Sequence, residues 1–443
     1  MIGSGYVTRL GAALATAAIF GAMIANPNAG KHYVEQATIA AAAVERTPLS
    51  ARACAIGEPA FAGPFADLDD ILSISPLGGV TAPGEVLPAP YIRLNTRAGE
   101  TAFERRQTSA LAPARADVTA IERHIDRDAY GRATAQRWTV HFRSCEKIHF
   151  YYGRLDSIAP ELLEKAGGLD RFSEFGGPDH IALETNIRVG AGDVIGVADG
   201  FDVGLHDLAA APAEMARPAR YRTNPYIGAS IYDAPASLVK AINPPTDRAR
   251  CPIDYLPKRQ QADWAAKLGD VWGIRKAKGE DACRTALIDR PSTLQGAWFT
   301  DSSHNGVASK VSAIALAPDT IDPDRQIFSL HGRLASLTPD LVALAPKMDS
   351  EKIAAAKDFL SFEKGDGRIN PAFSDITDDS VYCYEGLRAN FVGPLINGVI
   401  LVQRRADSEP AGSLRIEARG DVLSCTELDD PWEFSGNETI FFR

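Results

Sequence analysis

Short hydrophobic runs, broken by glycine and proline, dominate the first half of the chain and are typical of β-strands. Residues 138–142 and 148–152 flank a polar stretch, a pattern that predicts a β-hairpin. Residues 194–197 and 201–205 are separated by an Asp-Gly pair, which favours a tight turn with positive φ at the glycine. We therefore expect a β-rich domain in this region.

Hydrophobic positions at helical spacing are few. Residues 159–168 have proline near the start and glycine at the end, as helices prefer. Residues 234–242 and 258–268 follow, with Trp264 on the expected apolar face. We interpret these last two segments as a small helical extension that covers one edge of the sheet. Residues 338–362 predict a loop followed by a helix.

A second β-rich region begins near Leu294. Its later strands are predicted at residues 295–299, 326–330, 381–384, 398–404, 414–418 and 439–443. Ile400 and Val402 alternate with Leu401 and Gln403, which predicts one face in the core and the other in water. This periodicity favours an antiparallel β-barrel or sandwich.

The length of the chain predicts several domains, and its net charge argues against a nucleic-acid-binding protein. The 443 residues, 45% of them hydrophobic, are enough for two or three domains with sizeable cores. The net charge of −10 argues against a nucleic-acid surface, which needs an excess of lysine and arginine on one face.

The amino terminus has the pattern of an export signal. Arg9 precedes an uncharged apolar run at residues 10–25, and small, helix-breaking residues follow it. The run is shorter than the roughly 20 residues that a spanning helix needs, which favours cleavage over anchoring. We expect a signal peptide over residues 1–30, a tether over residues 31–70, and a periplasmic or extracellular protein that meets the membrane only if the signal stays uncleaved.

The cysteine count agrees with export. Six cysteines and no C-x-x-C pair favour disulfides over zinc or redox chemistry. Several pairings are formally possible. Sequence proximity favours Cys251 with Cys283 and Cys383 with Cys425, which leaves Cys54 with Cys145.

Four segments in succession resemble the lysostaphin-like zinc metallopeptidases of cell-wall metabolism. They are residues 76–94 (PLGGVTAPGEVLPAPYIRL), 111–122 (LAPARADVTAIE), 145–158 (CEKIHFYYGRLDSI) and 189–208 (VGAGDVIGVADGFDVGLHDL). The resemblance implies a mainly β fold, a lysostaphin-like β-sheet or barrel-sandwich domain with its helical extension over residues 71–290. A C-terminal antiparallel β-barrel or sandwich domain over residues 291–443 follows it, and no activity is implied for that domain.

The resemblance also shows what this chain lacks. The family carries an H-x-x-x-D pair, a Y-x-H-L motif and a terminal H-x-H. Here a segment centred on Glu85, then Tyr152-Gly153-Arg154-Leu155, then Asp202-Val203-Gly204 take those places. Catalytic zinc needs about three donor atoms and an open position for water. Arg154 has no lone pair to donate, and its fixed charge attracts a carboxylate or phosphate instead. We expect no bound metal or other cofactor and no catalytic residue.

The favoured hypothesis is a non-catalytic binding protein of the cell envelope on an inactive peptidase scaffold. Its ligand would be peptidoglycan, another glycan or an envelope protein. Glu85, Tyr91, Tyr152, Arg154 and Asp202 would line the inherited groove, with the tyrosines offering aromatic faces.

Two other classes stay open. A zinc-dependent peptidoglycan endopeptidase would need a rearranged metal site, for which Glu85, Asp202 and His206 are the best set. His141 and His149 fall on neighbouring strands of the predicted hairpin and can face one another, but strand histidines are more often structural than ligands. A structural tether or assembly factor would instead use the C-terminal domain.

Overall fold

The computed structural model describes residues 48–54, 60–80, 86–98, 105–128, 130–175, 177–218, 235–279, 282–283, 289–301, 312–331, 359–389, 395–406 and 412–443. Met1–Ala53 and Cys54–Arg443 form separate units. In the first, the described part holds the 3₁₀ helix Leu49–Ala51. The predicted signal peptide and residues 31–47 of the tether lie outside the described residues. Among the helices that are described, none is both long and apolar enough to cross a membrane.

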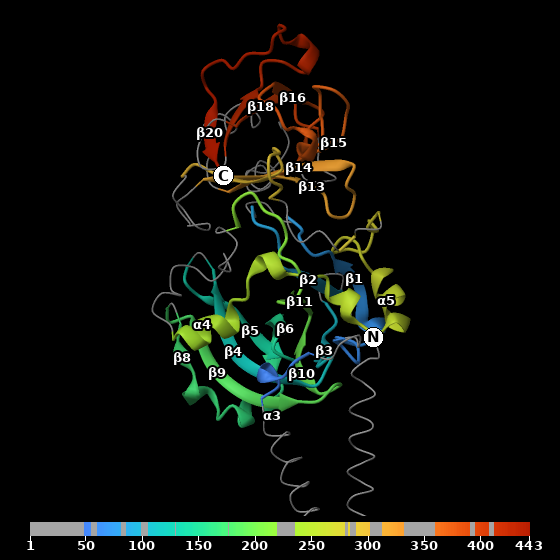
Figure 1. Ribbon diagram of the computed structural model, residues 1–443, viewed down its shortest axis with the longest axis vertical. Helices are drawn as coiled ribbons and strands as arrows, with labels where there is room; N and C mark the ends of the chain where they lie inside the picture. The colour runs from blue at the N-terminus through green and yellow to red at the C-terminus, as the bar shows by residue number, and fades with distance from the viewer. Residues whose placement is uncertain are drawn as a thin grey trace, which may run out of the picture. The chain divides into compact units, whose positions relative to one another are not determined.

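The chain is mainly β, with antiparallel sheets, as the sequence predicts. An eight-stranded sheet takes the order β1-β2-β11-β6-β5-β4-β9-β8 (Figure 1). Its strands are β1 (Ile71–Ser75), β2 (Tyr91–Thr96), β4 (Ala116–Arg127), β5 (Ala133–Arg143), β6 (Ile148–Leu155), β8 (Ser173–Glu174), β9 (His180–Val189) and β11 (Gly200–Asp207). A three-stranded sheet, β3-β10-β7, consists of β3 (Thr108–Leu111), β7 (Ser157–Ile158) and β10 (Val194–Ala198).

The two faces of the eight-stranded sheet differ because side chains alternate along each strand. On one face Ile92, Val203, Tyr152 and Val140, from β2, β11, β6 and β5, belong to the largest hydrophobic cluster. Residues of the smaller sheet, such as Ile195 of β10, belong to the same cluster. The other face carries polar side chains and holds the candidate site.

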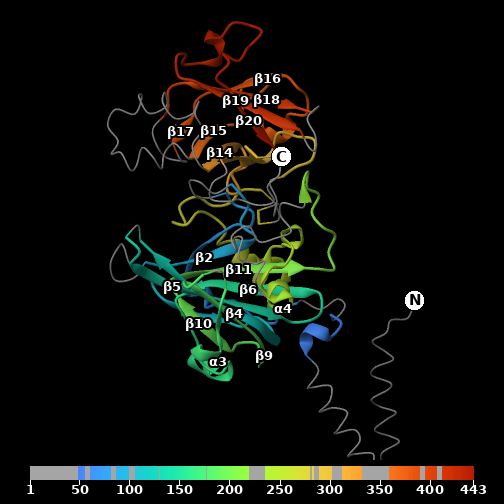
Figure 2. The ribbon, with the colours of Figure 1, turned by 90° about the vertical axis from the view of Figure 1, so that its left-hand side faces the viewer.

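Three short α-helices accompany these sheets: α3 (Pro160–Lys165), α4 (Ala236–Ile242) and α5 (Lys258–Ala265). All three were predicted, and Trp264 of α5 is 2% exposed. The helix α3 lies beside β10 (Figures 1 and 2), where Ala159 N donates to the carbonyl of Ile195. The segment after α5 covers the edge strand β1, because Ile74 bonds to Lys267 and Gly269 through its backbone. The predicted covering of one sheet edge is confirmed for this segment, whereas α4 packs against the inner strands β4 and β9.

The strands on either side of the Asp-Gly pair form as predicted, but they do not pair with each other. β10 pairs with β3 and β7, whereas β11 pairs with β2 and β6. Gly200 has φ 140°, and the chain turns there from one sheet into the other. Local turn chemistry predicts the bend correctly but does not decide which partner each strand takes.

The C-terminal part forms one nine-stranded antiparallel sheet in the order β16-β18-β19-β20-β12-β13-β14-β15-β17. Its strands are β12 (Gly296–Phe299), β13 (Ala313–Pro318), β14 (Arg325–His331), β15 (Phe359–Glu363), β16 (Val381–Tyr384), β17 (Arg388–Ala389), β18 (Val399–Arg405), β19 (Ser413–Arg419) and β20 (Thr439–Phe442). Tyr384 of β16 lies 4.9 Å from Phe362 of β15 between ring centroids, so strands far apart in the sheet order meet across one core.

Two expectations for this part were wrong. Residues 359–363 form strand β15 and not the end of a helix, while residues 338–358 lie outside the described part. Both faces of β18 are buried at its centre. Ile400 and Val402 enter the main C-terminal core, and Leu401 packs in a second cluster with Cys383 and Cys425. A disulfide cluster covers the face that strand alternation alone assigns to water.

The disulfides pair as the proximity argument predicts. Cys54–Cys145, Cys251–Cys283 and Cys383–Cys425 have Cα–Cα distances of 5.1, 5.5 and 5.9 Å. Three disulfides are typical of a protein that folds in an oxidising compartment.

Candidate functional site

The candidate site is the face of the eight-stranded sheet that points away from the main core, here named the polar face. Register places Tyr91 of β2 opposite Gly204 of β11, and Arg93 opposite Asp202. On the other side of β11, Asp202 is opposite Gly153 and His206 is opposite His149. Side chains from distant parts of the sequence therefore meet on one surface. The described part of this surface runs from β2 to β4.

An ion pair occupies the β2–β11 end of the polar face. Arg93 donates from Nε to Oδ1 of Asp202 at 2.7 Å and from Nη2 to Oδ2 at 3.2 Å. Nη2 also donates to the hydroxyl of Tyr91 at 3.3 Å. The side chain of Asp202 is 6% exposed and that of Arg93 is 34% exposed. The two-point geometry fixes both groups, and the guanidinium neutralises a nearly buried carboxylate.

The structure brings two of the five predicted ligand-binding residues together. Tyr91 and Asp202 both contact Arg93. Tyr152 does not join them: it is fully buried on the opposite face, and its hydroxyl donates to the carbonyl of Leu111 at 2.6 Å. Burial raises the pKa of Tyr152 well above its usual value. Glu85 lies outside the described residues.

Arg154 lies beside this end of the polar face at an irregularity of β6. Val140 pairs with Tyr152 but Trp138 pairs with Leu155, so β6 holds one more residue than β5 there. Arg154 is exposed and has φ 62°, a backbone conformation that non-glycine residues adopt at a cost. The extra residue changes the direction of the strand next to Gly153, which is opposite Asp202.

Four aromatic side chains form a buried cluster in the middle of the polar face. The ring centroids of His141 and His149 are 5.6 Å apart, and those of His149 and His206 are 6.1 Å apart. Tyr151 lies 5.5 Å from His141 and 6.1 Å from His206. All three histidines are at most 3% exposed. The expectation that His141 and His149 face one another is confirmed. We name these four residues the histidine cluster.

The histidine cluster is held uncharged on its β6–β11 side. Burial, with the charges of His141, Arg143 and His206, lowers the pKa of His149 well below its usual value. Burial also lowers the pKa of His206 to about 4, although its bond to the carbonyl of Pro245, Nδ1 to O at 2.9 Å, acts in the other direction. Both nitrogens of His149 and Nε2 of His206 are buried without a hydrogen-bond partner in the part of the chain that is described.

Glu122 of β4 anchors the other side of the cluster. Its Oε1 lies 2.6 Å from Nε2 of His141 and its Oε2 lies 2.9 Å from Nε2 of His180. Burial raises the pKa of Glu122, but hydrogen bonds and charge from the two histidines outweigh burial and lower it to about 2. Glu122 is therefore an anion at neutral pH, and both histidines turn an N–H toward it.

The donor groups do not converge. Within the described ranges, no group of three or more His, Cys, Asp or Glu side chains is placed to hold a metal ion. The rings of His141, His149 and His206 lie tilted by 45° and 38° along their row. Asp202 is bonded to Arg93, and Gly204 has no side chain.

Sequence reasoning missed Arg93 and Glu122, and it did not predict the contact between Tyr151 and Gly204. Gly204 leaves the space that the ring of Tyr151 fills, because a Cβ atom there would lie 2.0 Å from Cε1 of Tyr151. The alternation of side chains along a strand predicts that Tyr91 and Arg93 of β2 lie on the same face, so Arg93 could have been selected together with Tyr91. Their cross-strand partners needed the register, which the sequence does not state.

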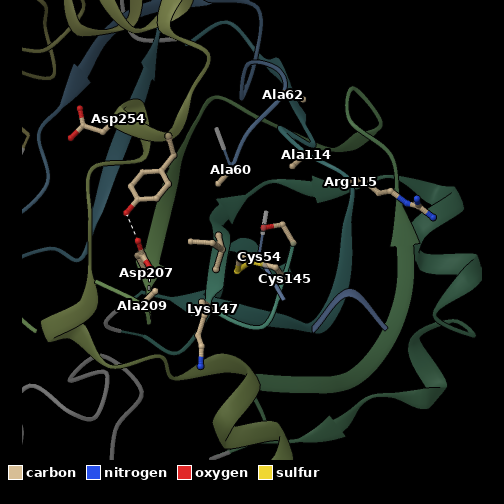
Figure 3. A pocket seen from close by; sticks show the side chains of 13 residues that line it. Cys54, Ala60, Ala62, Ala114, Arg115, Cys145, Lys147, Asp207, Ala209 and Asp254 are labelled. Carbon is tan, nitrogen blue, oxygen red and sulfur yellow. Dashed lines mark hydrogen bonds between the residues drawn. A yellow bond between two sulfur atoms is a disulfide. The ribbon is translucent and has the colours of Figure 1, made fainter. Parts of the chain in front are cut away.

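A separate cavity of about 490 Å³ lies beside the Cys54–Cys145 disulfide (Figure 3). The hydroxyl of Tyr255 donates to Oδ2 of Asp207 at 2.7 Å in its wall. Figure 3 shows the charged end of Lys147 pointing away from the disulfide. The cavity has the volume of a small-molecule site, but it gathers no charge of one sign.

Searches with this chain found no matching family model, no matching curated protein and no matching solved structure.

Proposed function

We propose that this chain is an exported, non-catalytic binding protein built on a degenerate lysostaphin-like scaffold, which acts in the periplasm or outside the cell. Peptidoglycan is the ligand that the resemblance favours, with another glycan or an envelope protein as the alternatives. The export pattern of residues 1–30 and the three disulfides support this placement.

The observation that carries the proposal is the ion pair between Arg93 and Asp202. The resemblance puts Asp202 and Gly204 where the peptidases have the two histidines of H-x-H. Asp202 instead holds a guanidinium through two hydrogen bonds, and Gly204 has no donor atom. A guanidinium at this place repels a dication and occupies the carboxylate that could bind one.

The pairing of strands adds support for the scaffold. The segments that correspond to Y-x-H-L and H-x-H lie on neighbouring strands, β6 and β11, with Gly153 opposite Asp202. Gly153 and Asp202 are 49 positions apart in the sequence and are brought together by this pairing, whereas Tyr152 of the first segment faces the core.

Arg154 is the residue that we assign to ligand recognition. It is exposed and stands one residue after Gly153, while Tyr91 adds a half-buried aromatic ring on β2. An exposed guanidinium on β6 and an aromatic ring two strands away on β2 suit a ligand that combines a carboxylate or phosphate with a sugar or peptide face.

Sedimentation with purified peptidoglycan tests the proposal. Arg154→Ala should reduce retention about fivefold, the effect of one exposed ion pair of about 1 kcal/mol. Arg259→Ala, at an exposed position of α5, is the matched control and should leave retention unchanged. Equal retention of the wild type and Arg154→Ala would contradict the assignment, and no retention of the wild type would remove peptidoglycan as the ligand.

A second candidate is a zinc-dependent endopeptidase with a rearranged site. One observation favours it: the buried nitrogens of His149 and Nε2 of His206 have no hydrogen-bond partner in the described part. A metal would have to draw on His206 with Asp202 and Glu85. Hydrolysis of peptidoglycan that a chelator stops and zinc restores would favour this candidate.

A further inference from the structure

Three exposed hydrophobic side chains lie together in the turn after α5. Val271, Trp272 and Ile274 are 41%, 62% and 80% exposed. In the described part of the chain nine large hydrophobic side chains are exposed, and these three fall within four consecutive positions. Single exposed hydrophobic residues are ordinary, but a cluster marks a site of contact. We name these three residues the apolar tip.

Backbone hydrogen bonds hold the apolar tip in place. Asp270 N donates to the carbonyl of Arg275 at 2.9 Å, and Gly273 N donates to the carbonyl of Asp270 at 3.0 Å. Ile274 N donates to Oδ1 of Asp270 at 2.8 Å. Gly273, with φ 67°, makes the turn possible. The hydrophobic side chains are therefore presented on a fixed turn, so little ordering is needed when they bind.

Two cationic side chains, Arg105 and Lys276, lie at the apolar tip, and the turn also holds the carboxylate of Asp270. The guanidinium carbon of Arg105 lies 4.9 Å from the ring centroid of Trp272. Lys276 is exposed on the same turn, and the positive charges of Arg97 and Lys276 act on Lys267, whose pKa is lowered first by burial and then by them. Asp69 opposes these charges in part. A local excess of cations on a chain of net charge −10 favours an anionic partner.

We propose that the apolar tip inserts into the headgroup region of an anionic lipid bilayer. Trp272 and Ile274 enter the interface, where an indole ring is at its most favourable depth, while Arg105 and Lys276 contact lipid phosphates. Three side chains on one turn offer far less area than the roughly 800 Å² per partner of a stable protein interface. A bilayer has no such minimum, because each buried side chain and each basic residue adds separately to the affinity.

Tryptophan fluorescence of the full chain with lipid vesicles tests this inference. The vesicles contain phosphatidylglycerol and phosphatidylcholine, with brominated acyl chains as a quencher of inserted indole rings. The Trp272→Ser variant emits only from the other four tryptophans. Subtracting its spectrum from that of the wild type leaves the emission of Trp272. The apolar run at residues 10–25 is present in every variant and can itself bind the vesicle. The difference spectrum removes this contribution and reports only on Trp272 of the apolar tip. Ile274→Ser should weaken the quenching several-fold, and Lys276→Gln about fivefold.

Leu423→Ser is the matched control, since Leu423 is 63% exposed at a distant position in the sequence, and it should not change the quenching. Salt at about 0.5 M should weaken the quenching, because Lys276 is exposed. An equal Trp272 signal with brominated and unbrominated lipid would overturn the inference. A blue shift that grows with protein concentration in the absence of lipid would overturn it in favour of contact between copies of the chain.

Discussion

Tyr151 lies across the backbone of Gly204 on the neighbouring strand, so closely that a Cβ atom on the glycine would fall 2.0 Å from Cε1 of the ring. The ring cannot move far, because His141 and His206 flank it at centroid distances of 5.5 and 6.1 Å. The glycine and the tyrosine together set the shape of the histidine cluster.

Gly204→Ala should therefore overpack the polar face and lower the free energy of unfolding by about 1–3 kcal/mol. Denaturant midpoints check this, with Gly63→Ala as the control, because nothing lies within 4 Å of a Cβ atom at Gly63. Adding Tyr151→Ala should recover part of the loss, since the clash disappears. Equal midpoints for Gly204→Ala and the wild type would contradict this packing.

Stability should fall as the pH drops below 6.5. The pKa of His206 is about 4 in the folded chain against an ordinary 6.5, so in this window the unfolded chain binds a proton that the folded chain does not. The loss from this group is about 2 kcal/mol between pH 6.5 and pH 5. Glu122, with a pKa of about 2, stays ionised throughout this range and does not oppose the trend.

Urea midpoints at pH 7 and pH 5 measure this loss. His206→Asn keeps a donor for the carbonyl of Pro245 but cannot titrate, so its midpoint should depend less on pH. The same pH dependence in the variant and the wild type would exclude His206 as the source.

Removing Arg93 should destabilise the chain more than neutralising Asp202, its partner in the ion pair. Arg93→Ala leaves a carboxylate that is 6% exposed without its guanidinium and should lower the free energy of unfolding by about 2 kcal/mol. Asp202→Asn should have a smaller effect, because Arg93 is 34% exposed and can turn to water. A double-mutant cycle with no coupling energy would contradict the bidentate pairing.

The Cys383–Cys425 disulfide should stabilise the C-terminal sheet, because it closes a loop with a sequence separation of 42 and fills the cluster beneath Leu401. Replacing both cysteines with serine should lower the free energy of unfolding by about 4 kcal/mol. Thermal and denaturant unfolding of the oxidised proteins check the value. An unchanged midpoint would mean that the loop is ordered without the bond.

Much of the fold could be predicted from local patterns. The β5–β6 hairpin, the helices α3, α4 and α5, and the predicted C-terminal strands follow from hydrophobic period and turn residues. The strand β15 was missed because residues 338–362 contain an Ala-rich, helix-favouring run before Phe359. Helix propensity depends only on the residues of the segment itself, whereas β15 forms because it pairs with β14.

The candidate site was less predictable than the fold. Asp202 and Tyr91 could be selected from motif positions, but their common partner Arg93 required the register of β2 against β11. An error of one position changes the face on which a side chain lies. Tyr152 faces the core, whereas its neighbour Tyr151 belongs to the histidine cluster.

The metal content of the chain, purified without chelator, decides whether the scaffold has lost its zinc site. A scaffold whose Asp202 is held by Arg93 predicts far less than one zinc per chain, in the wild type and in His206→Ala alike. One zinc per chain, lost in His206→Ala, would contradict the account of an inactive scaffold.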